Sequence, residues 1–100
     1  MKTSVALILV LTASSALAHH EDAPINSGTE LRDWCKVASE AAIIGKGVTP
    51  YNWTASYWDQ GNMLMVKGKW RVNSADVTVE CSIARGAEAR FAVMSVEDAQ

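Results

Sequence analysis

The stretch of sequence that decides the fold is residues 63–83, MLMVKGKWRVNSADVTVECSI. Its apolar residues occur at every second position on both sides of a turn-forming segment, residues 73–76. A period of two is typical of strands with one face buried and the other in water, and Asn, Ser and Asp favour turns. The side chains expected to point inwards are Leu64, Val66, Gly68, Trp70, Val72, Val77, Val79, Cys81 and Ile83. The stretch therefore predicts a β-hairpin with one apolar face.

The same alternation continues on either side of this hairpin. Residues 51–58 place Trp53, Ala55 and Tyr57 on one face, and the cluster at 59–62 predicts a turn before Met63. A third turn at residues 85–86 leads to the least clearly patterned strand, residues 89–96. Three hairpin connections predict a four-stranded antiparallel meander.

The registers of the first two hairpins can be checked against each other. A four-residue loop at 59–62 places Trp58 opposite Met63 and Trp53 opposite Gly68, where a large ring can cover the glycine gap. In the second hairpin we expect Val72 opposite Val77, which places Lys69 opposite Glu80. Both registers put all the side chains expected to point inwards on one face, so they are mutually consistent.

A helix precedes the strands. Ser27 and Glu30 fit a capping box, in which the Ser27 hydroxyl accepts from the backbone of Glu30 and the Glu30 carboxylate reaches back. The apolar stripe expected to face the sheet consists of Leu31, Trp34, Cys35, Ala38, Ala41 and Ala42. The opposite, polar side consists of Arg32, Asp33, Lys36, Ser39 and Glu40. Gly45 or Gly47 ends the helix, and Pro50 prevents its continuation.

Cys35 and Cys81 are the only cysteines, and both fall on predicted inward faces. The alternative, a metal or redox pair, has no CxxC spacing and no nearby histidine. We therefore expect a disulfide between helix and sheet, which a domain this small needs for stability. The predicted fold class is α+β, with one N-terminal amphipathic helix packed on a four-stranded antiparallel meander sheet and closed by one helix–sheet disulfide.

The first residues predict the compartment. Lys2, the apolar run 5–11 and the Ala16-Leu17-Ala18 pattern are typical of a secretory signal peptide over residues 1–18, too short to span a bilayer. We expect a flexible arm over residues 19–26, a single domain over 27–96 and a C-terminal tail over 97–100. The mature protein is then periplasmic or secreted, with no stable membrane insertion after cleavage.

Charge and histidine placement exclude several function classes. Without Lys2, eight basic residues stand against eleven acidic ones, a net charge of −3, and the signs are interspersed. This distribution argues against nucleic acid and anionic membranes as partners. Both histidines fall in the expected arm and both thiols in the expected disulfide, so no nucleophile–base system can be assembled. We predict that the protein is not an enzyme and that it binds no cofactor.

The strongest candidate site is the outward face of the sheet. It carries Trp58, Met63 and Met65 at one end, followed by a basic row of Lys67, Lys69 and Arg71. An exposed tryptophan beside two methionines can anchor a protein or stack on a glycan, so the prediction is a binding or inhibitor-like module. Two other interpretations stay open: the arm or residues 97–100 cover Trp58, or the basic row is a solvated strand edge that resists pairing.

Copper binding is the alternative from another functional class. Cleavage after Ala18 exposes His19 as a free N-terminus beside His20, a good chelate for Cu(II) or Ni(II). The Met63 and Met65 thioethers near Trp58 form a soft site of the kind that suits Cu(I), although methionine is also a common gap-filler.

Overall fold

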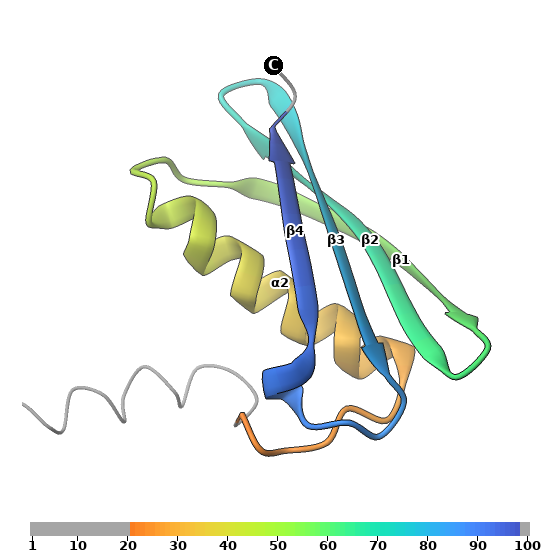
Figure 1. The fold of residues 1–100 in the computed structure, drawn as a ribbon. Coiled ribbons are helices and arrows are strands. Elements are labelled where there is room, and N and C mark those ends of the chain that lie inside the picture. The colour runs from red at the N-terminus through yellow and green to blue at the C-terminus, as the bar shows by residue number, and fades with distance from the viewer. Residues whose placement is uncertain (1–20, 99–100) are drawn as a thin grey trace, which may run out of the picture.

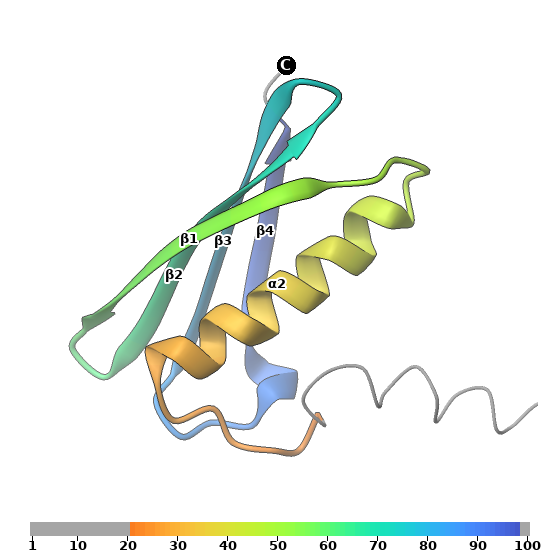
Figure 2. The same ribbon diagram turned by 180° about the vertical axis from the view of Figure 1, so that it is seen from behind.

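The computed structural model describes residues 21–98 and shows one helix packed on a four-stranded antiparallel sheet. The elements are α2 (Gly28–Ile44), β1 (Tyr51–Gln60), β2 (Met63–Val72), β3 (Ala75–Ala84), the 3-10 helix η2 (Ala89–Phe91) and β4 (Val93–Asp98). The strands lie side by side in chain order, and α2 crosses one face of the sheet diagonally (Figures 1 and 2). The predicted fold class is confirmed. The predicted signal peptide and the His19/His20 pair lie outside the described residues.

The start of α2 follows the predicted capping box. The Glu30 amide donates to the Ser27 hydroxyl at 3.2 Å, and the Glu30 carboxylate accepts from the Asn26 amide at 2.6 Å. The carboxylate thus reaches one residue further back than the cap itself.

No helix in residues 21–98 combines the length and the apolar composition needed to cross a membrane.

The buried side of α2 differs from the predicted stripe at its C-terminal half. Leu31, Cys35, Ser39 and Ile43 are buried, whereas Ala41 and Ala42 are exposed. These four residues, spaced four apart, form one ridge along the helix, so Ser39 lies inside instead of on the polar side. Its hydroxyl donates to the Cys35 carbonyl at 2.6 Å and accepts from Nε1 of Trp70 at 2.9 Å. A serine whose hydroxyl is satisfied in this way can be buried at little cost.

The first two turns are shorter than predicted. Each has two residues, Gly61–Asn62 and Asn73–Ser74, with positive φ at Gly61 (65°), Asn73 (52°) and Ser74 (71°). These are the turn conformations that match the twist of a hairpin. Both registers therefore differ by two residues from the prediction, so that Trp58 lies opposite Met65 and Lys67 lies opposite Glu80. Because an even shift leaves every side chain on its own face, the predicted inner and outer faces are correct.

An unpredicted β-bulge interrupts the start of β1. Tyr51 pairs with Arg71 and Thr54 with Lys69, which leaves Asn52 and Trp53 opposite Trp70 alone. Asn52, the first residue of the bulge, has the left-handed φ of 58° that is typical of one class of β-bulge. Ala55, not Trp53, lies opposite Gly68, but the Trp53 ring still occupies the space where a Gly68 side chain would stand. The predicted covering of the glycine gap is thus present with a different register.

The Cys35–Cys81 disulfide joins α2 to β3 as predicted, with the two Cα atoms 6.2 Å apart. Both cysteines belong to the core between helix and sheet, together with Leu64, Val66, Trp70, Val79 and Ile83. Trp34 and Trp53 are partly buried and pack against this core. The core therefore lies on the inner face of the sheet, towards α2.

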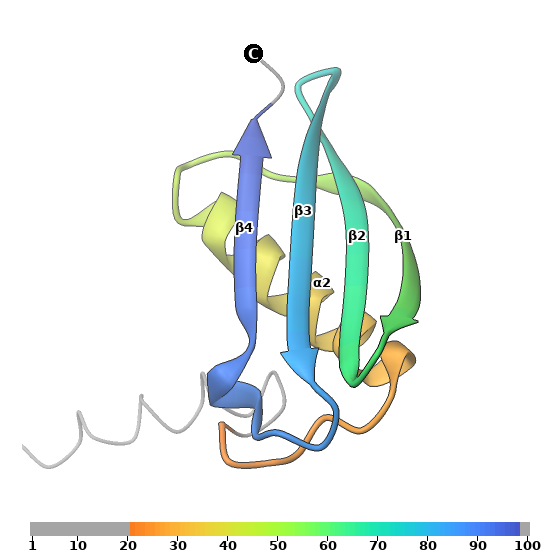
Figure 3. The ribbon, with the colours of Figure 1, turned by 45° about the vertical axis from the view of Figure 1, so that its right-hand side comes forward.

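Residues 21–26, part of the flexible arm predicted over residues 19–26, are docked against the domain in the structure. Ile25 is fully buried, and its amide donates to the Ala87 carbonyl at 2.9 Å. Backbone bonds from Ala89 to Ala23 and from Arg90 to Glu21 continue this pairing, and the two segments run side by side in Figure 3. The buried Ile25 side chain, which belongs to the core, and these backbone bonds together hold the segment against the domain.

The last strand also differs from the predicted residues 89–96. Residues 89–91 form η2, and β4 begins at Val93 and continues to Asp98. Glu97 and Asp98, expected in a C-terminal tail, therefore extend the sheet. These two residues lack the apolar alternation that identifies a strand in the sequence, and β4 lies at the edge of the sheet.

Candidate functional site

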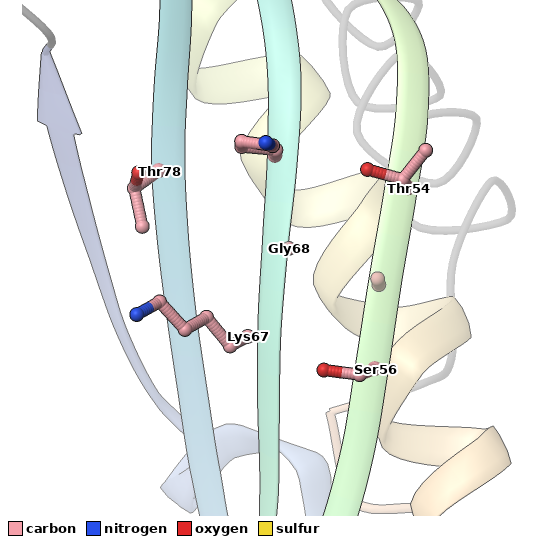
Figure 4. Close-up of a pocket in the computed structure, with 7 residues that line it drawn as sticks. Thr54, Ser56, Lys67, Gly68 and Thr78 are labelled. Atoms are coloured by element: carbon pink, nitrogen blue, oxygen red, sulfur yellow. The ribbon is translucent and has the colours of Figure 1, made fainter.

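The candidate site is the outer face, defined here as the face of the sheet opposite α2. Among the described residues no helix lies over it, and Figure 4 shows the strands in front of the helix when this face is viewed. All six predicted binding residues lie on this face, because β2 presents Met63, Met65, Lys67, Lys69 and Arg71 on one side and Trp58 pairs with Met65. The structure thus brings together the residues that the sequence pattern selected.

One end of the outer face is apolar. We call this the apolar patch, and it consists of Trp58, Met63, Met65, Ala84 and Val93. Trp58, Met65, Ser82 and Val93 form a single row across all four strands. The exposed fractions are 43% for Trp58, 38% for Met63 and 65% for Val93. These side chains are therefore accessible at positions where a two-layer fold has no second helix to cover them.

A shallow hollow lies inside the apolar patch. Its volume is about 210 Å³, and Trp58 and Val93 stand on either side of Met65 and Ser82. Glu80 and Ser95 complete its polar rim. A hollow with an aromatic wall and a polar rim can accept an apolar group or a sugar ring while it hydrogen-bonds the groups around it.

The other end of the outer face is polar. A second hollow of about 520 Å³ is lined by Thr54, Ser56, Thr78 and the β2 segment around Gly68. In Figure 4 the Thr54 and Ser56 hydroxyls both point towards β2, and Lys67 extends towards β3. This half offers hydroxyl and ammonium groups to a ligand that lies along the sheet.

The basic row is partly neutralised by acidic neighbours. Lys69 Nζ lies 3.6 Å from Oδ2 of Asp76, and Arg71 Nη1 lies 3.2 Å from Oδ1 of the same carboxylate. Lys67 faces Glu80 across the strand pair. β2 lies between β1 and β3, so the interpretation of this row as a protective strand edge is wrong.

The described residues also decide what covers Trp58. Residues 21–25 lie against residues 86–90 and not on the apolar patch, and Glu97 and Asp98 are part of β4. Neither segment, as far as the structure describes it, covers the Trp58 ring. Ala84 and Val93 are the members of the patch that the sequence analysis did not select, although the alternation of Val93, Ser95 and Glu97 with Met94 and Val96 was a usable signal for Val93.

The candidate metal ligands are placed only in part. Met63 and Met65 share the outer face, with Trp58 directly opposite Met65. Within residues 21–98 there is no group of three or more His, Cys, Asp or Glu side chains that could hold a metal ion. Both cysteines are in the disulfide, so neither thiol can act as a metal ligand or a nucleophile.

The fold and the site together define a small two-layer α+β domain with one open sheet face. No protein-family model, curated protein or solved structure matches the chain.

Proposed function

We propose that this protein is a small, exported, non-catalytic binding module that recognises a protein or glycan through the outer face around Trp58. The observation that carries the proposal is the apolar patch, where three large side chains are each more than one third exposed on an uncovered sheet. Contiguous exposed apolar surface on a small domain commonly marks an interaction site. Tryptophan and methionine are also enriched at the centres of protein interfaces.

The residues around Trp58 favour a binding site over a tryptophan that is exposed by chance. Its indole forms one wall of the hollow whose rim is Glu80, Ser82 and Ser95. An apolar centre with a polar rim is the usual anatomy of a binding surface. The hydroxyls of Thr54, Ser56 and Thr78 extend hydrogen-bonding capacity along the face, which suits a partner longer than the patch itself.

Export and the lack of catalysis are parts of the same proposal. The Cys35–Cys81 disulfide is compatible with an oxidising compartment, which agrees with the signal peptide predicted over residues 1–18. On the outer face, Lys69 and Arg71 are paired with Asp76 across β2 and β3, and a general acid or base needs a free, positioned group. An inhibitor-like role, in which the patch blocks another protein, is the form of binding that size and export favour.

In-cell photo-cross-linking tests this proposal directly. A photoreactive amino acid at position 58 should form adducts with a partner protein in the exported fraction, and mass spectrometry would identify it. The matched control places the same residue at position 44, because Ile44 is exposed at the end of α2 and away from the outer face. A glycan array probed with the wild type and with Trp58→Ala tests the other partner class.

The possible results of these two experiments either support or contradict the proposal. Adducts at position 58 but not 44, or a glycan signal lost on Trp58→Ala, would support the proposal. Equal labelling at both positions, together with no glycan signal that depends on Trp58, would contradict it.

A second candidate function, Cu(I) binding, is favoured by the placement of Met63, Met65 and Trp58 on one face. Thioethers are ligands that Cu(I) prefers. Titration with Cu(I) in the presence of a competing chelator should show tight binding that Met65→Leu removes, if this second function is correct. Binding that persists in Met65→Leu and disappears when residues 19–22 are deleted would instead assign the metal to the predicted His19/His20 terminus.

A further inference from the structure

The charges of the outer face are sorted by strand. All of its basic side chains, Lys67, Lys69 and Arg71, come from β2. Its acidic side chains come from the other half of the sheet, with Asp76 and Glu80 on β3 and Glu97 on β4. The apolar side chains are also divided, since Trp58 and Met63 belong to β1 and β2 whereas Ala84 and Val93 belong to β3 and β4. The outer face thus has two halves with complementary contents.

The register makes this complementarity specific. A half-turn about an axis that runs along the strands, between β2 and β3, would place β2 of one copy over β3 of another and β1 over β4. Each row of paired residues would then lie over the same row of the second copy. Lys67 would face the partner's Glu80, and Arg71 would face the partner's Asp76, because these residues share rows. In the apolar patch, Trp58 would face the partner's Val93, and Met63 would face the partner's Ala84.

We infer that the outer face is self-complementary and that a second copy of this chain docks on it as a two-fold symmetric homodimer. A two-fold interface uses the same surface on both subunits, so each favourable pair occurs twice. Two sheets packed face to face lie about 10 Å apart, a distance that a lysine and a glutamate can span together. The dimer would be a four-layer assembly with the two helices outside.

The charge pattern also excludes the other simple arrangement. A two-fold axis perpendicular to the strands would place β2 antiparallel over the partner's β2. Centred on Lys69, it would put Lys69 over its own copy and Lys67 over the partner's Arg71, so that only basic side chains face one another along this row. Like charges facing one another across an interface are strongly unfavourable. The axis along the strands is therefore the one that the side chains favour.

Self-association goes beyond the proposed function and stands without it. If both hold, the second copy and the external partner compete for the apolar patch, and only this competition rests on the proposed function. The dimer would then keep Trp58 covered until a partner of higher affinity replaces the second copy.

The test is sedimentation equilibrium of the purified protein over about 1 µM to about 1 mM, the range of weak protein association. The wild type should shift from one chain to two as concentration rises. Glu80→Lys places like charges over each other twice per dimer and should weaken association about tenfold or more. The double variant Lys67→Glu/Glu80→Lys restores both pairs and should restore association. Glu40→Lys, on α2, is the matched control with the same change in net charge.

Each possible result either supports or contradicts the proposed dimer. Weakening by Glu80→Lys, recovery in the double variant and no effect of Glu40→Lys support the dimer, with circular dichroism confirming that each variant is folded. A wild type that stays monomeric throughout contradicts it and leaves the proposed partner binding intact. Association that is unchanged in Glu80→Lys, or that is not restored in the double variant, contradicts this interface.

Discussion

Trp70 and Trp58 lie on opposite faces of the same sheet, and the two residues show how differently those faces are used. Trp70 is 4% exposed, donates to Ser39 on α2 and contacts the Trp53 ring with centroids 5.0 Å apart. Trp58 is 43% exposed and pairs with Met65 on an uncovered surface. The same residue type therefore stabilises the fold on the inner face and remains available for binding on the outer one.

What separates the two faces is a single helix. The sheet alone presents apolar side chains on both sides at its Trp58 end, and α2 covers only the inner side. A fold with one helix for one sheet leaves its second face to water, to another copy or to a partner. Stability and binding can therefore be perturbed separately, and the following predictions use that separation.

The largest loss of stability should come from Trp70→Ala. Truncation of a buried tryptophan costs about 3–5 kcal/mol, and here it also removes the donor that the Ser39 hydroxyl accepts from. Urea denaturation should show a loss near the upper end of that range. A loss below about 1 kcal/mol, the usual size of a surface change, would mean that the inner face is not the core.

Loss of the Cys35–Cys81 bridge should have the next largest effect. The cysteines are 46 residues apart, and a loop of that length restricts the unfolded chain by roughly 4 kcal/mol in the entropic model. Thermal unfolding with and without reductant should show a markedly lower Tm after reduction. Two thiols that react with an alkylating agent in the native, unreduced protein would contradict the bridge.

Ser39→Ala should have an intermediate effect. It leaves Nε1 of Trp70 buried without its acceptor, and an unsatisfied buried donor costs roughly 1–3 kcal/mol. The exposed helix position Lys36 offers a control, since Lys36→Ala removes no buried hydrogen bond. Equal unfolding free energies for the two variants would show that the contact between Ser39 and Trp70 contributes nothing.

The smallest change in stability should come from Trp58→Ala. As a surface substitution it should cost under about 1 kcal/mol, while it weakens partner binding by about 2 kcal/mol or more, as expected for an aromatic anchor. Its tryptophan fluorescence should also move to shorter wavelength, because the most exposed indole on the sheet has been removed. A variant that unfolds would place Trp58 in the core and remove the contrast between the two faces.

The inner and outer faces were predictable from the sequence because side chains alternate strictly along a strand. The hairpin registers were not, since residues 59–62 and 73–76 allow either two- or four-residue turns. The resulting shift of two residues changed every cross-strand partner, including those of Trp58 and Lys67, but left each residue on its face. For that reason, the residues of the candidate site still share the outer face.

Other features could not be predicted from the sequence, because they depend on contacts between residues that are far apart in the chain. Ser39 is buried because Trp70, 31 residues away, donates to it, and a helical pattern read alone places a serine outside. Ile25 is buried because residues 86–90 pair with the segment that precedes α2. The bulge at Asn52 and Trp53 adjusts β1 to the ring that covers Gly68.

The sequence by itself therefore determined the element types, the disulfide and the two faces, because periodicity, capping and turn chemistry act between near neighbours. Only the tertiary structure decided which residues lie opposite one another, how deeply Ser39 and Ile25 are buried, and that the acidic strands lie on one side of the basic one. Those outcomes depend on contacts between segments far apart in the chain, where a shift of two residues preserves every local preference and changes every partner. The complementary halves of the outer face are visible only once that register is known.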